Sequence, residues 1–292
     1  MSFLAHPIEA MEEQPLFDIR HLQDRDRREL NKRIIRAACR SVYVGGNEVL
    51  CRVLGRFPMY VEGGDVSIGQ HMILNGFWEM HVTEALAKAV EPGMTVVDVG
   101  ANCGYFTLVM GHLAGKQGRC IAIEASPVMM ARLAKTLRAA GMFPRCSLHE
   151  VAVCDESGQE IDLHVAAVSP MNAKIGDPPG GKMAALETHR VQSSTLDDCL
   201  EGQRVDVMKV DIEGAEESMW AGAQETLASS PDIVIVMEVN SRRYQDAGAF
   251  YRSIQNAGFP LRYLDARNGV VDCTVEELAT TKGLKMLYLT RR

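Results

Sequence analysis

The stretch VVDVGANCGYFT, at residues 96–107, decides the fold of this chain. An apolar run of strand type contains an acidic residue near its end, a turn with two glycines follows, and the next residues have helical character. Gly100 and Gly104 let the backbone turn tightly and approach a ligand, and the start of the following helix offers free N–H groups. This order predicts a ligand site at the first strand-to-helix turn of an α/β sheet.

The rest of the chain continues the alternation of strands and helices that a sheet covered on both faces requires. Helices are expected from Pro127, with Ser126 as N-cap, and at residues 215–228 and 249–257. We therefore predict an α/β fold whose sheet is mostly parallel with helices on both faces. The expected strands are residues 95–99, 120–124, 147–151, 205–211, 233–239, 261–265 and 285–289.

Composition and charge narrow the class of protein. The 292 residues are 47% hydrophobic and 24% charged, which excludes disorder and coiled coil as the main architecture. The net charge of -7 disfavours general binding of nucleic acid. The eight cysteines include no C-x-x-C pair, which is typical of scattered thiols in a reducing compartment. With no signal peptide and no long apolar run, we expect a cytoplasmic protein without a transmembrane segment.

Two segments depart from the alternation. Residues 27–40 predict a basic amphipathic helix in which Leu30, Ile34 and Ala38 mark one face. Such a helix docks on membranes or acidic partners, or it packs on the domain and leaves its charges in solvent. A Gly- and Pro-rich loop at residues 169–183, between short strands, is expected to be a mobile lid over the carboxyl edge of the sheet.

The second motif, IAIEASP, brings Glu124 to the end of the next strand, 24 residues after Gly100. An acidic side chain in this place accepts both hydroxyls of a ribose in nucleotide-binding sheets. A dinucleotide fingerprint would have glycine where this chain has Asn102, which weakens the interpretation as a pyrophosphate site. The turn instead suits a cofactor whose carboxylate and amine lie over it, with Asp98 near the cationic end.

Two further motifs place acidic residues at neighbouring strand tips. VMKVDIEGAE, at residues 207–216, carries Asp211 and Glu213, and VIVMEVN carries Glu238 and Asn240. Ligands of open α/β sheets gather at the carboxyl ends of the strands. Carboxylates there serve as a base, orient a hydroxyl or hold a divalent ion. Glu213 equally suits the first turn of a helix, and a strand-end acid such as Glu238 also caps helices.

Taken in order, VVDVGANCGYFT, IAIEASP, TLDD, MKVDIEGAE and VMEVN resemble the FkbM family of S-adenosylmethionine-dependent methyltransferases, over roughly residues 65–290. The resemblance implies a Rossmann-like, seven-stranded methyltransferase sheet at residues 65–292, preceded by a partly helical N-terminal extension at residues 1–64. GQHMILNGFWEMHVTEAL, at residues 69–86, is similar to that family's lead-in helix. The implied reaction is O-methylation of a hydroxyl on a sugar, glycan or other natural product, with S-adenosyl-L-methionine as cofactor.

The resemblance also implies the site residues. The methionine part of the cofactor is expected around the glycine turn, the ribose at Glu124 and the adenine near residues 150–152, with Trp78 and Glu79 closing over the cofactor. Catalysis is assigned to Asp211, Glu213 and Glu238. These acids, with Asn240, would also give a divalent ion oxygen ligands, although no motif indicates a metal. The expected cofactor residues are Glu79, Asp98, Gly100, Ala101, Asn102, Gly104, Tyr105, Glu124, Ala125, Val151, Ala152 and Asp211.

Two alternative functions stay open at this point. An NAD-dependent oxidoreductase uses the same kind of sheet, but Asn102 and the lack of a second nucleotide-binding half argue against it. A cofactor-binding module without turnover would not need Asp211 and Glu213. The histidines show no metal-binding spacing, and only His189, beside the Gly/Pro loop, is a candidate base.

Overall fold

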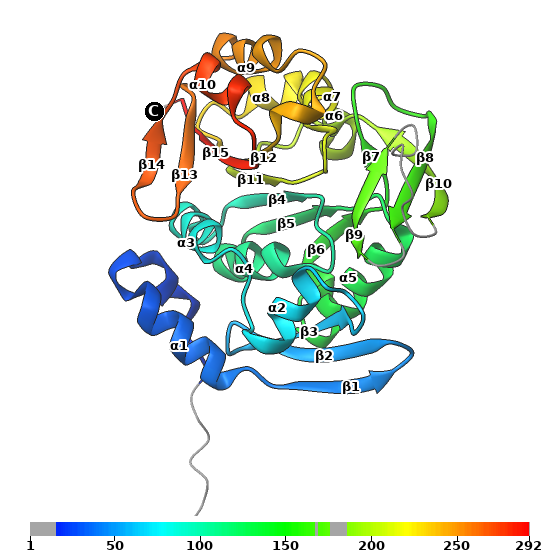
Figure 1. Cartoon of the computed structure of the whole chain (residues 1–292), viewed down its shortest axis with the longest axis vertical. Coiled ribbons are helices and arrows are strands. Elements are labelled where there is room, and N and C mark those ends of the chain that lie inside the picture. The colour runs from blue at the N-terminus through cyan, green and yellow to red at the C-terminus, as the bar shows by residue number, and fades with distance from the viewer. Residues whose placement is uncertain (1–15, 167–168, 176–185, 292) are drawn as a thin grey trace, which may run out of the picture.

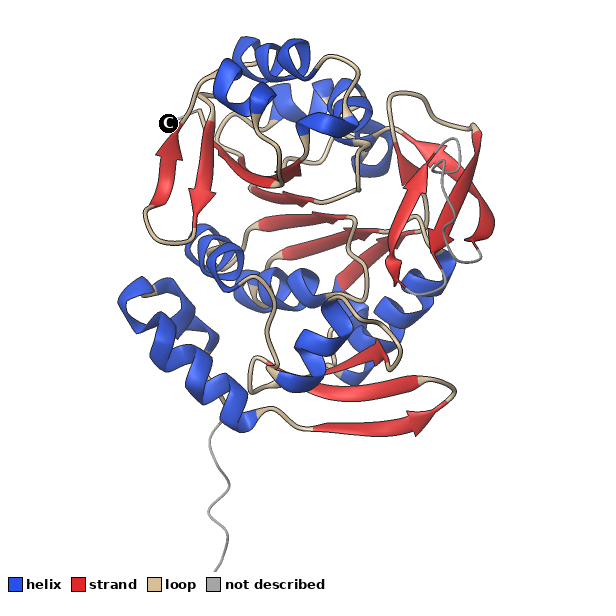
Figure 2. Ribbon diagram, viewed as in Figure 1, coloured by secondary structure: helices blue, strands red, loops and turns tan. Residues whose placement is uncertain are grey.

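A mostly parallel sheet runs through the centre of the molecule and carries helices on both faces (Figure 1, Figure 2). The computed structural model describes residues 16–166, 169–175 and 186–291, within which this sheet has eight strands in the order β14-β13-β15-β12-β11-β4-β5-β6. The predicted α/β fold is confirmed, and the eighth strand comes from β14, which pairs with β13 as an edge hairpin. The strands are β4 (Thr95–Val99), β5 (Arg119–Ile123), β6 (Cys146–His149), β11 (Val207–Val210), β12 (Val234–Val239), β13 (Arg262–Asp265), β14 (Gly269–Asp272) and β15 (Lys285–Leu289).

The strand order places the two halves of the fold on opposite sides of β4. β4 pairs in parallel with β5 on one side and with β11 on the other. The chain runs outward from β4 through β5 to β6, and then returns to the other side to form β11 and β12. A crevice opens at such a reversal, beside the carboxyl ends of the strands.

Alternate side chains of β4 serve the two hydrophobic cores, because successive residues of a strand point to opposite faces. Val96 belongs to one core, and Val97 and Val99 belong to the other. The first core is closed by α3 (Met80–Ala89), α4 (Tyr105–Ala114) and α5 (Pro127–Ala139). The second is closed by α6 (Leu196–Leu200), α7 (Glu216–Ala221), α8 (Gln224–Ser229), α9 (Ala247–Asn256) and α10 (Val275–Thr280).

Helix caps explain where the predicted helices begin and break. The Ser126 hydroxyl accepts a hydrogen bond from the Met129 N–H, so α5 begins as expected. The single helix predicted at residues 215–228 was wrong, because the chain forms α7 and α8 with a break between them. Asp197, from the TLDD motif, accepts hydrogen bonds from the N–H groups of Glu225 and Thr226 and so starts α8 anew.

The N-terminal region contains a small sheet that the sequence analysis did not predict. β1 (Ser41–Gly45), β2 (Glu48–Val53) and β3 (Phe57–Glu62) form an antiparallel sheet in that order. β3 packs on α5, where the Tyr60 N–H donates to the Thr136 hydroxyl at 3.1 Å. The buried side chains of β2 and β3 belong to the same core as those of α4 and α5. One hydrophobic core therefore extends across residue 64. The predicted boundary there, between an N-terminal extension and the methyltransferase domain, stays a prediction.

Two helical predictions in this region are corrected. α1 (Arg28–Ala38), which follows the short turns η1 (Ile19–Gln23) and η2 (Arg25–Arg27), buries Asn31 and Ile35 and leaves Leu30 and Ile34 exposed. The face marked by Leu30 and Ile34 is therefore not the one that packs on the domain, because a helix places residues four apart on one face and Asn31 and Ile35 form the buried one. The stretch at residues 69–86 forms two helices, α2 (Ile68–Leu74) and α3, rather than one.

A third sheet, of four strands, borders the cavity at the carboxyl ends of the central strands. It consists of β7 (Ala152–Val153), β10 (Leu186–Ser194), β8 (Glu160–Ala166) and β9 (Ser169–Ile175), in that order. The first seven residues of the predicted Gly/Pro loop thus form β9, paired with β8, and the rest of that loop lies outside the described residues. Within the described ranges, no helix is long and apolar enough to cross a membrane.

We expect Gly100→Ala to destabilise the fold more than Gly141→Ala does. Both glycines have a positive φ, of 77° and 68°, so both substitutions carry the cost of a left-handed alanine, about 1–2 kcal/mol. A Cβ on Gly100 would lie 1.9 Å from the carbonyl oxygen of Asp211, whereas one on Gly141 would meet no atom within 4 Å. The extra loss for Gly100→Ala should be about 1–3 kcal/mol in urea unfolding. Equal losses would show that the Asp211 carbonyl moves aside.

Candidate functional site

A cavity of about 300 Å³ opens at the carboxyl ends of β4, β5, β11 and β12. Its lining comes from the turn after β4, the ends of β5 and β11, the segment before α3 and the four-stranded sheet. Most of the residues that the sequence analysis assigned to the cofactor meet here. The predicted residues that line it are Glu79, Gly100, Ala101, Asn102, Tyr105, Glu124, Ala125, Val151, Ala152, Asp211, Glu213 and Glu238, together with Trp78.

The turn after β4 is fixed by its own backbone and by β5. The N–H groups of Gly100 and Ala101 both donate to the carbonyl of Ile123, at 2.9 and 3.0 Å. Asn102 has a left-handed φ of 52°, and its side-chain oxygen accepts from the Cys103 N–H at 2.6 Å. Gly104 then caps α4 with a φ of 96°. The left-handed conformation that glycine supplies in a dinucleotide turn is therefore adopted here by an asparagine.

Glu124 lies directly beside this turn. Its two carboxylate oxygens accept from the N–H groups of Asn102 and Ser126, each at 2.8 Å. Burial raises the pKa of Glu124, against the opposing effect of the two N–H donors. Each oxygen has a second lone pair, so the carboxylate can hold the turn and still accept hydrogen bonds from a ligand.

Asp98 lies beneath the cavity rather than on its wall. Its carboxylate is fully buried in β4 and accepts from the Thr107 hydroxyl at 2.6 Å, while its other oxygen has no hydrogen-bond partner among the described residues. Burial raises the pKa of Asp98, and Lys209 opposes this shift. The predicted contact between Asp98 and the cationic end of a cofactor therefore has no open path past the neighbouring side chains that line the cavity.

Lys209 is a cavity residue that the sequence analysis missed. It stands in β11 opposite Asp98, is only 2% exposed, and its Nζ lies 3.0 Å from the carboxylate of Asp211. The ammonium also lies 4.9 Å from the centre of the Phe106 ring. Burial disfavours the charged form, but Asp211 and Asp98 outweigh it and the pKa of Lys209 is raised. The available signal was a lysine inside the apolar run VMKV, where no unpaired charge is expected.

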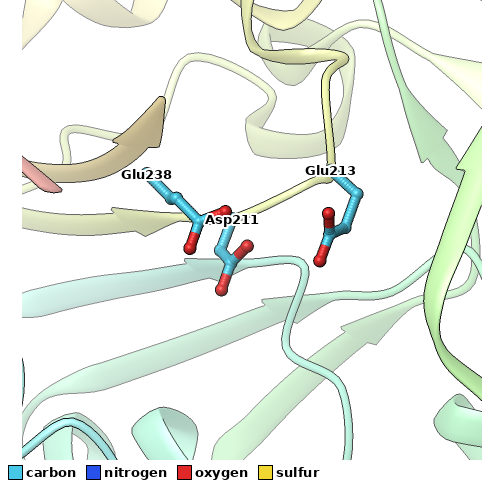
Figure 3. Close-up of side chains that lie close together, drawn as sticks. All are labelled: Asp211, Glu213 and Glu238. Atoms are coloured by element: carbon cyan, nitrogen blue, oxygen red, sulfur yellow. The ribbon is translucent and has the colours of Figure 1, made fainter. Parts of the chain in front are cut away.

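Three carboxyl groups gather at the far side of the cavity. Figure 3 shows Asp211 and Glu238 at adjacent strand tips and Glu213 on the following loop, with their oxygens within 4.8 Å of one another. Arg243, which the sequence analysis did not single out, lies 2.6 Å from the Glu213 carboxylate and 3.6 Å from that of Glu238. Burial, with the negative charges of Asp211 and Glu213, raises the pKa of Glu238 to about 8.

These carboxylates offer the oxygen ligands that divalent cations prefer, but Lys209 and Arg243 already neutralise part of their charge. Asn240, considered as a further ligand, instead caps a turn by accepting from the Arg242 N–H. The arrangement therefore gives no independent support for a metal ion.

Glu79 forms the opposite wall of the same space. It precedes α3 with a left-handed φ of 31°, and one of its carboxylate oxygens has no partner among the described residues. Burial, reinforced by Asp211, raises the pKa of Glu79 to about 7. A left-handed conformation costs free energy for any residue other than glycine, and residues strained in this way are typical of functional sites.

An acid that the sequence analysis missed, Glu216, supports the loop after β11. Glu216 is fully buried and accepts hydrogen bonds from the Gly214 N–H at 3.1 Å and the Tyr244 hydroxyl at 2.8 Å. It thereby holds Glu213, whose φ is 57°, in place. His189, the alternative base, lies on β10 beside Glu187 and is not among the cavity residues.

The lining as a whole has an excess of acceptors over donors. Five carboxyl groups border the cavity, and Lys209 is its only lining cation among the described residues. One oxygen of Glu79 has no hydrogen-bond partner among the described residues, which adds to this excess. The cavity therefore favours a ligand that brings positive charge and hydrogen-bond donors. Beside Asp211, Glu213 and Glu238, it disfavours phosphate or carboxylate groups.

Glu238→Gln should flatten the pH dependence of stability in the ligand-free protein. Burial raises the pKa of this carboxyl from its ordinary value of 4.5 to about 8 in the folded protein, so its stabilising contribution is complete below pH 4.5 and is lost as the pH rises through about 8. The neutral glutamine keeps no such dependence, and its advantage over wild type should grow by about 2–4 kcal/mol between those limits. Urea unfolding across pH measures this. The exposed Glu201→Gln is the control, and parallel curves for wild type and Glu238→Gln would contradict the assignment.

The similarity to known sequences extends over most of this site. A family model described as the methyltransferase FkbM domain matches residues 98–261. Protein-L-isoaspartate O-methyltransferase 1 of Arabidopsis thaliana is 30% identical over 144 residues, covering 45% of this chain and 62% of the relative. Ribosomal RNA large subunit methyltransferase E of Acinetobacter baumannii is 31% identical over 83 residues, covering 28% of this chain and 38% of the relative. The chain thus spans less than two thirds of these relatives.

Solved structures give more distant similarity. A SAM-dependent O-methyltransferase from Thermotoga maritima matches 74% of this chain and 66% of its own with a TM-score of 0.43 and 10% identity. Aeropyrum pernix fibrillarin, crystallised with S-adenosyl-L-methionine, matches 69% of this chain and 68% of its own with a TM-score of 0.38 and 12% identity. The family match covers more than half of the chain and includes both glycine-turn and acid motifs. The protein therefore belongs to the FkbM family of S-adenosylmethionine-dependent methyltransferases.

Proposed function

We propose that this methyltransferase acts on a hydroxyl oxygen of a sugar, glycan or related natural product. The observation that carries the proposal is the cluster of Asp211, Glu213 and Glu238 at the cavity end, where their oxygens lie within 4.8 Å of one another. A neutral polyol supplies hydrogen-bond donors to such acceptors, and its methylation requires a group that removes the hydroxyl proton. Both requirements are met by carboxylates.

We assign the cofactor to the part of the cavity nearest β4 and β5. Glu124 accepts hydrogen bonds from the ribose hydroxyls, and Val151 and Ala152 pack against the adenine. The turn at residues 100–102, with Tyr105, surrounds the methionine part, and Glu79 faces its positive charge. The support is that all of these groups line one continuous cavity, with unused acceptor capacity on Glu124 and Glu79.

S-adenosylmethionine supplies a methyl group on a positively charged sulfur, so the protein's task is to position the acceptor and take its proton. Asp211 orients the hydroxyl, since Lys209 holds one of its oxygens at 3.0 Å and leaves the other without a hydrogen bond to any described residue. Glu238, in its ionised form, takes the proton as the oxygen–methyl bond forms and the sulfur–methyl bond breaks. Its pKa of about 8 makes it the stronger proton acceptor near neutral pH. Arg243 stabilises the charges of Glu213 and Glu238.

A screen with purified protein tests the proposed reaction directly. S-adenosylmethionine is mixed with sugars, glycans and hydroxylated natural products, and products are detected by the mass of one added methyl group. Methyl transfer to hydroxyl oxygens is expected. Transfer confined to protein carboxyl groups or to RNA, as the names of the curated relatives would suggest for those proteins, would refute the proposal.

Glu124→Gln should weaken cofactor binding while the fold is retained. Glutamine keeps the size of the side chain but loses the charge that strengthens hydrogen bonds to ribose, a loss of about 1.5–3 kcal/mol, or roughly 10- to 150-fold in Kd. Titration calorimetry with S-adenosylmethionine and S-adenosylhomocysteine measures the change. Glu91→Gln, on an exposed residue, is the matched control. An unchanged Kd with a lowered Tm would make Glu124 a purely structural residue.

Glu238→Gln should abolish the pH dependence of methyl transfer. In the wild type, kcat/KM should rise as the pH increases through about 8, because only ionised Glu238 accepts a proton. The variant should lose roughly 10²- to 10⁴-fold in kcat while it still binds the cofactor. Asp211→Asn should lower kcat and shift the pH profile to lower pH, because the charge of Asp211 raises the pKa of Glu238, and the exposed Glu225→Gln should do neither. A wild-type profile that falls with rising pH would exclude this base.

A further inference from the structure

The segment at residues 27–47 carries charge of the opposite sign to the rest of the chain. Residues 27–47 contain six arginines and lysines and one glutamate, a net charge of +5, in a chain whose net charge is -7. The remaining residues together carry -12. Such an asymmetry produces a local positive field that attracts negatively charged surfaces.

The same region exposes apolar side chains. On β1, Val42 is 56% exposed, Tyr43 67% and Val44 45%. Successive strand residues point to opposite sides, so both faces of β1 are open to solvent. β1 is also the edge strand of its sheet, and residues 41–46 contain no charged side chain that would protect this edge.

The helix that leads into β1 has the same mixed character. Leu30 and Ile34 are 42% and 39% exposed, while Asn31 and Ile35 face the core. The solvent-facing side of α1 also carries Arg33, and Arg40 follows at its end. Figure 1 shows α1 and β1 in succession along one side of the molecule, away from the central sheet. Leu30 and Ile34 thus form an apolar strip that faces the solvent.

We propose that the α1–β1 surface, formed by Arg33, Ile34, Arg40, Val42, Tyr43 and Val44, docks the protein on an anionic phospholipid bilayer. Basic side chains attract the lipid headgroups, and aliphatic side chains enter the boundary between headgroups and acyl chains. Tyr43 suits the same depth, because its ring is apolar and its hydroxyl is polar.

Charge and shape favour a bilayer over other partners. A second copy of the chain would bring another segment of +5 against the first, which repels it. A nucleic acid offers phosphates to the arginines but gives Val42 and Val44 nothing apolar to contact. A rigid acidic protein would cover one face of β1, whereas a fluid interface surrounds both. The proposal is independent of the acceptor, since these residues do not line the cavity.

Vesicle sedimentation with the full-length protein tests the proposal. The protein should pellet with vesicles of phosphatidylcholine mixed with phosphatidylglycerol and remain in solution with phosphatidylcholine alone, and salt should weaken its binding. Arg33→Glu should lower the partition coefficient at least about fivefold. Val42→Ser combined with Val44→Ser should lower it about tenfold. Arg252→Glu on α9 and Val270→Ser on β14, which are exposed elsewhere, are the matched controls and should bind as wild type does.

Further measurements make the outcome decisive. Each variant should bind S-adenosylmethionine as wild type does, which shows that it is folded. If a variant fails to fold, Tyr43→Trp in the otherwise native chain should show a blue-shifted emission with phosphatidylglycerol vesicles only. Failure of the wild type to pellet with those vesicles, or equal effects of the control substitutions, would overturn the proposal. So would a dimer in light scattering that the Val42→Ser and Val44→Ser pair disrupts, because it would assign β1 to a second copy.

Discussion

Burying a lysine ammonium in the middle of a parallel sheet is costly unless carboxylates surround it, and Lys209 depends on this compensation. Asp211 lies 3.0 Å from its Nζ, and Asp98 stands opposite it on β4. The pair joins the sheet interior to the cavity, since Asp98 is fully buried and Asp211 faces the ligand space. Removal of the lysine charge would leave the buried carboxylate of Asp98 and the partly exposed carboxylate of Asp211 without the cation between them, so fold and site share one electrostatic constraint.

That constraint also explains the electrostatics of the cavity. Lys209 lowers the pKa values of Glu79 and Glu238, but burial and the charge of Asp211 outweigh it and both values are raised. Two acids with pKa values near neutrality therefore border the space where a cationic sulfur would lie. Bound positive charge favours their ionised forms, so cofactor binding should release protons.

Much of this could be predicted from sequence, because the decisive residues are close together in the chain. The turn after β4 is built from consecutive residues, and Glu124 follows at a spacing that the fold dictates. Lys209 and Arg243 were not predicted, since their roles arise from strand pairing and from a loop contact with Gly214. Periodicity failed on α1 because the sequence offers two apolar pairs at helical spacing, and tertiary packing selected Ile35 rather than Ile34.

The break between α7 and α8 was hidden for a similar reason, because the cap comes from Asp197, far away in sequence. The same kind of distant contact fixes the acids at the end of the cavity. Glu216 binds the Gly214 N–H and the Tyr244 hydroxyl, which ties the loop after β11 to the segment after β12. Glu213 has a left-handed φ of 57°, and a strained residue of this kind persists only where its surroundings hold it. The acids of β11 and β12 are therefore in position before any ligand arrives, so methyl transfer need not bear the cost of assembling them.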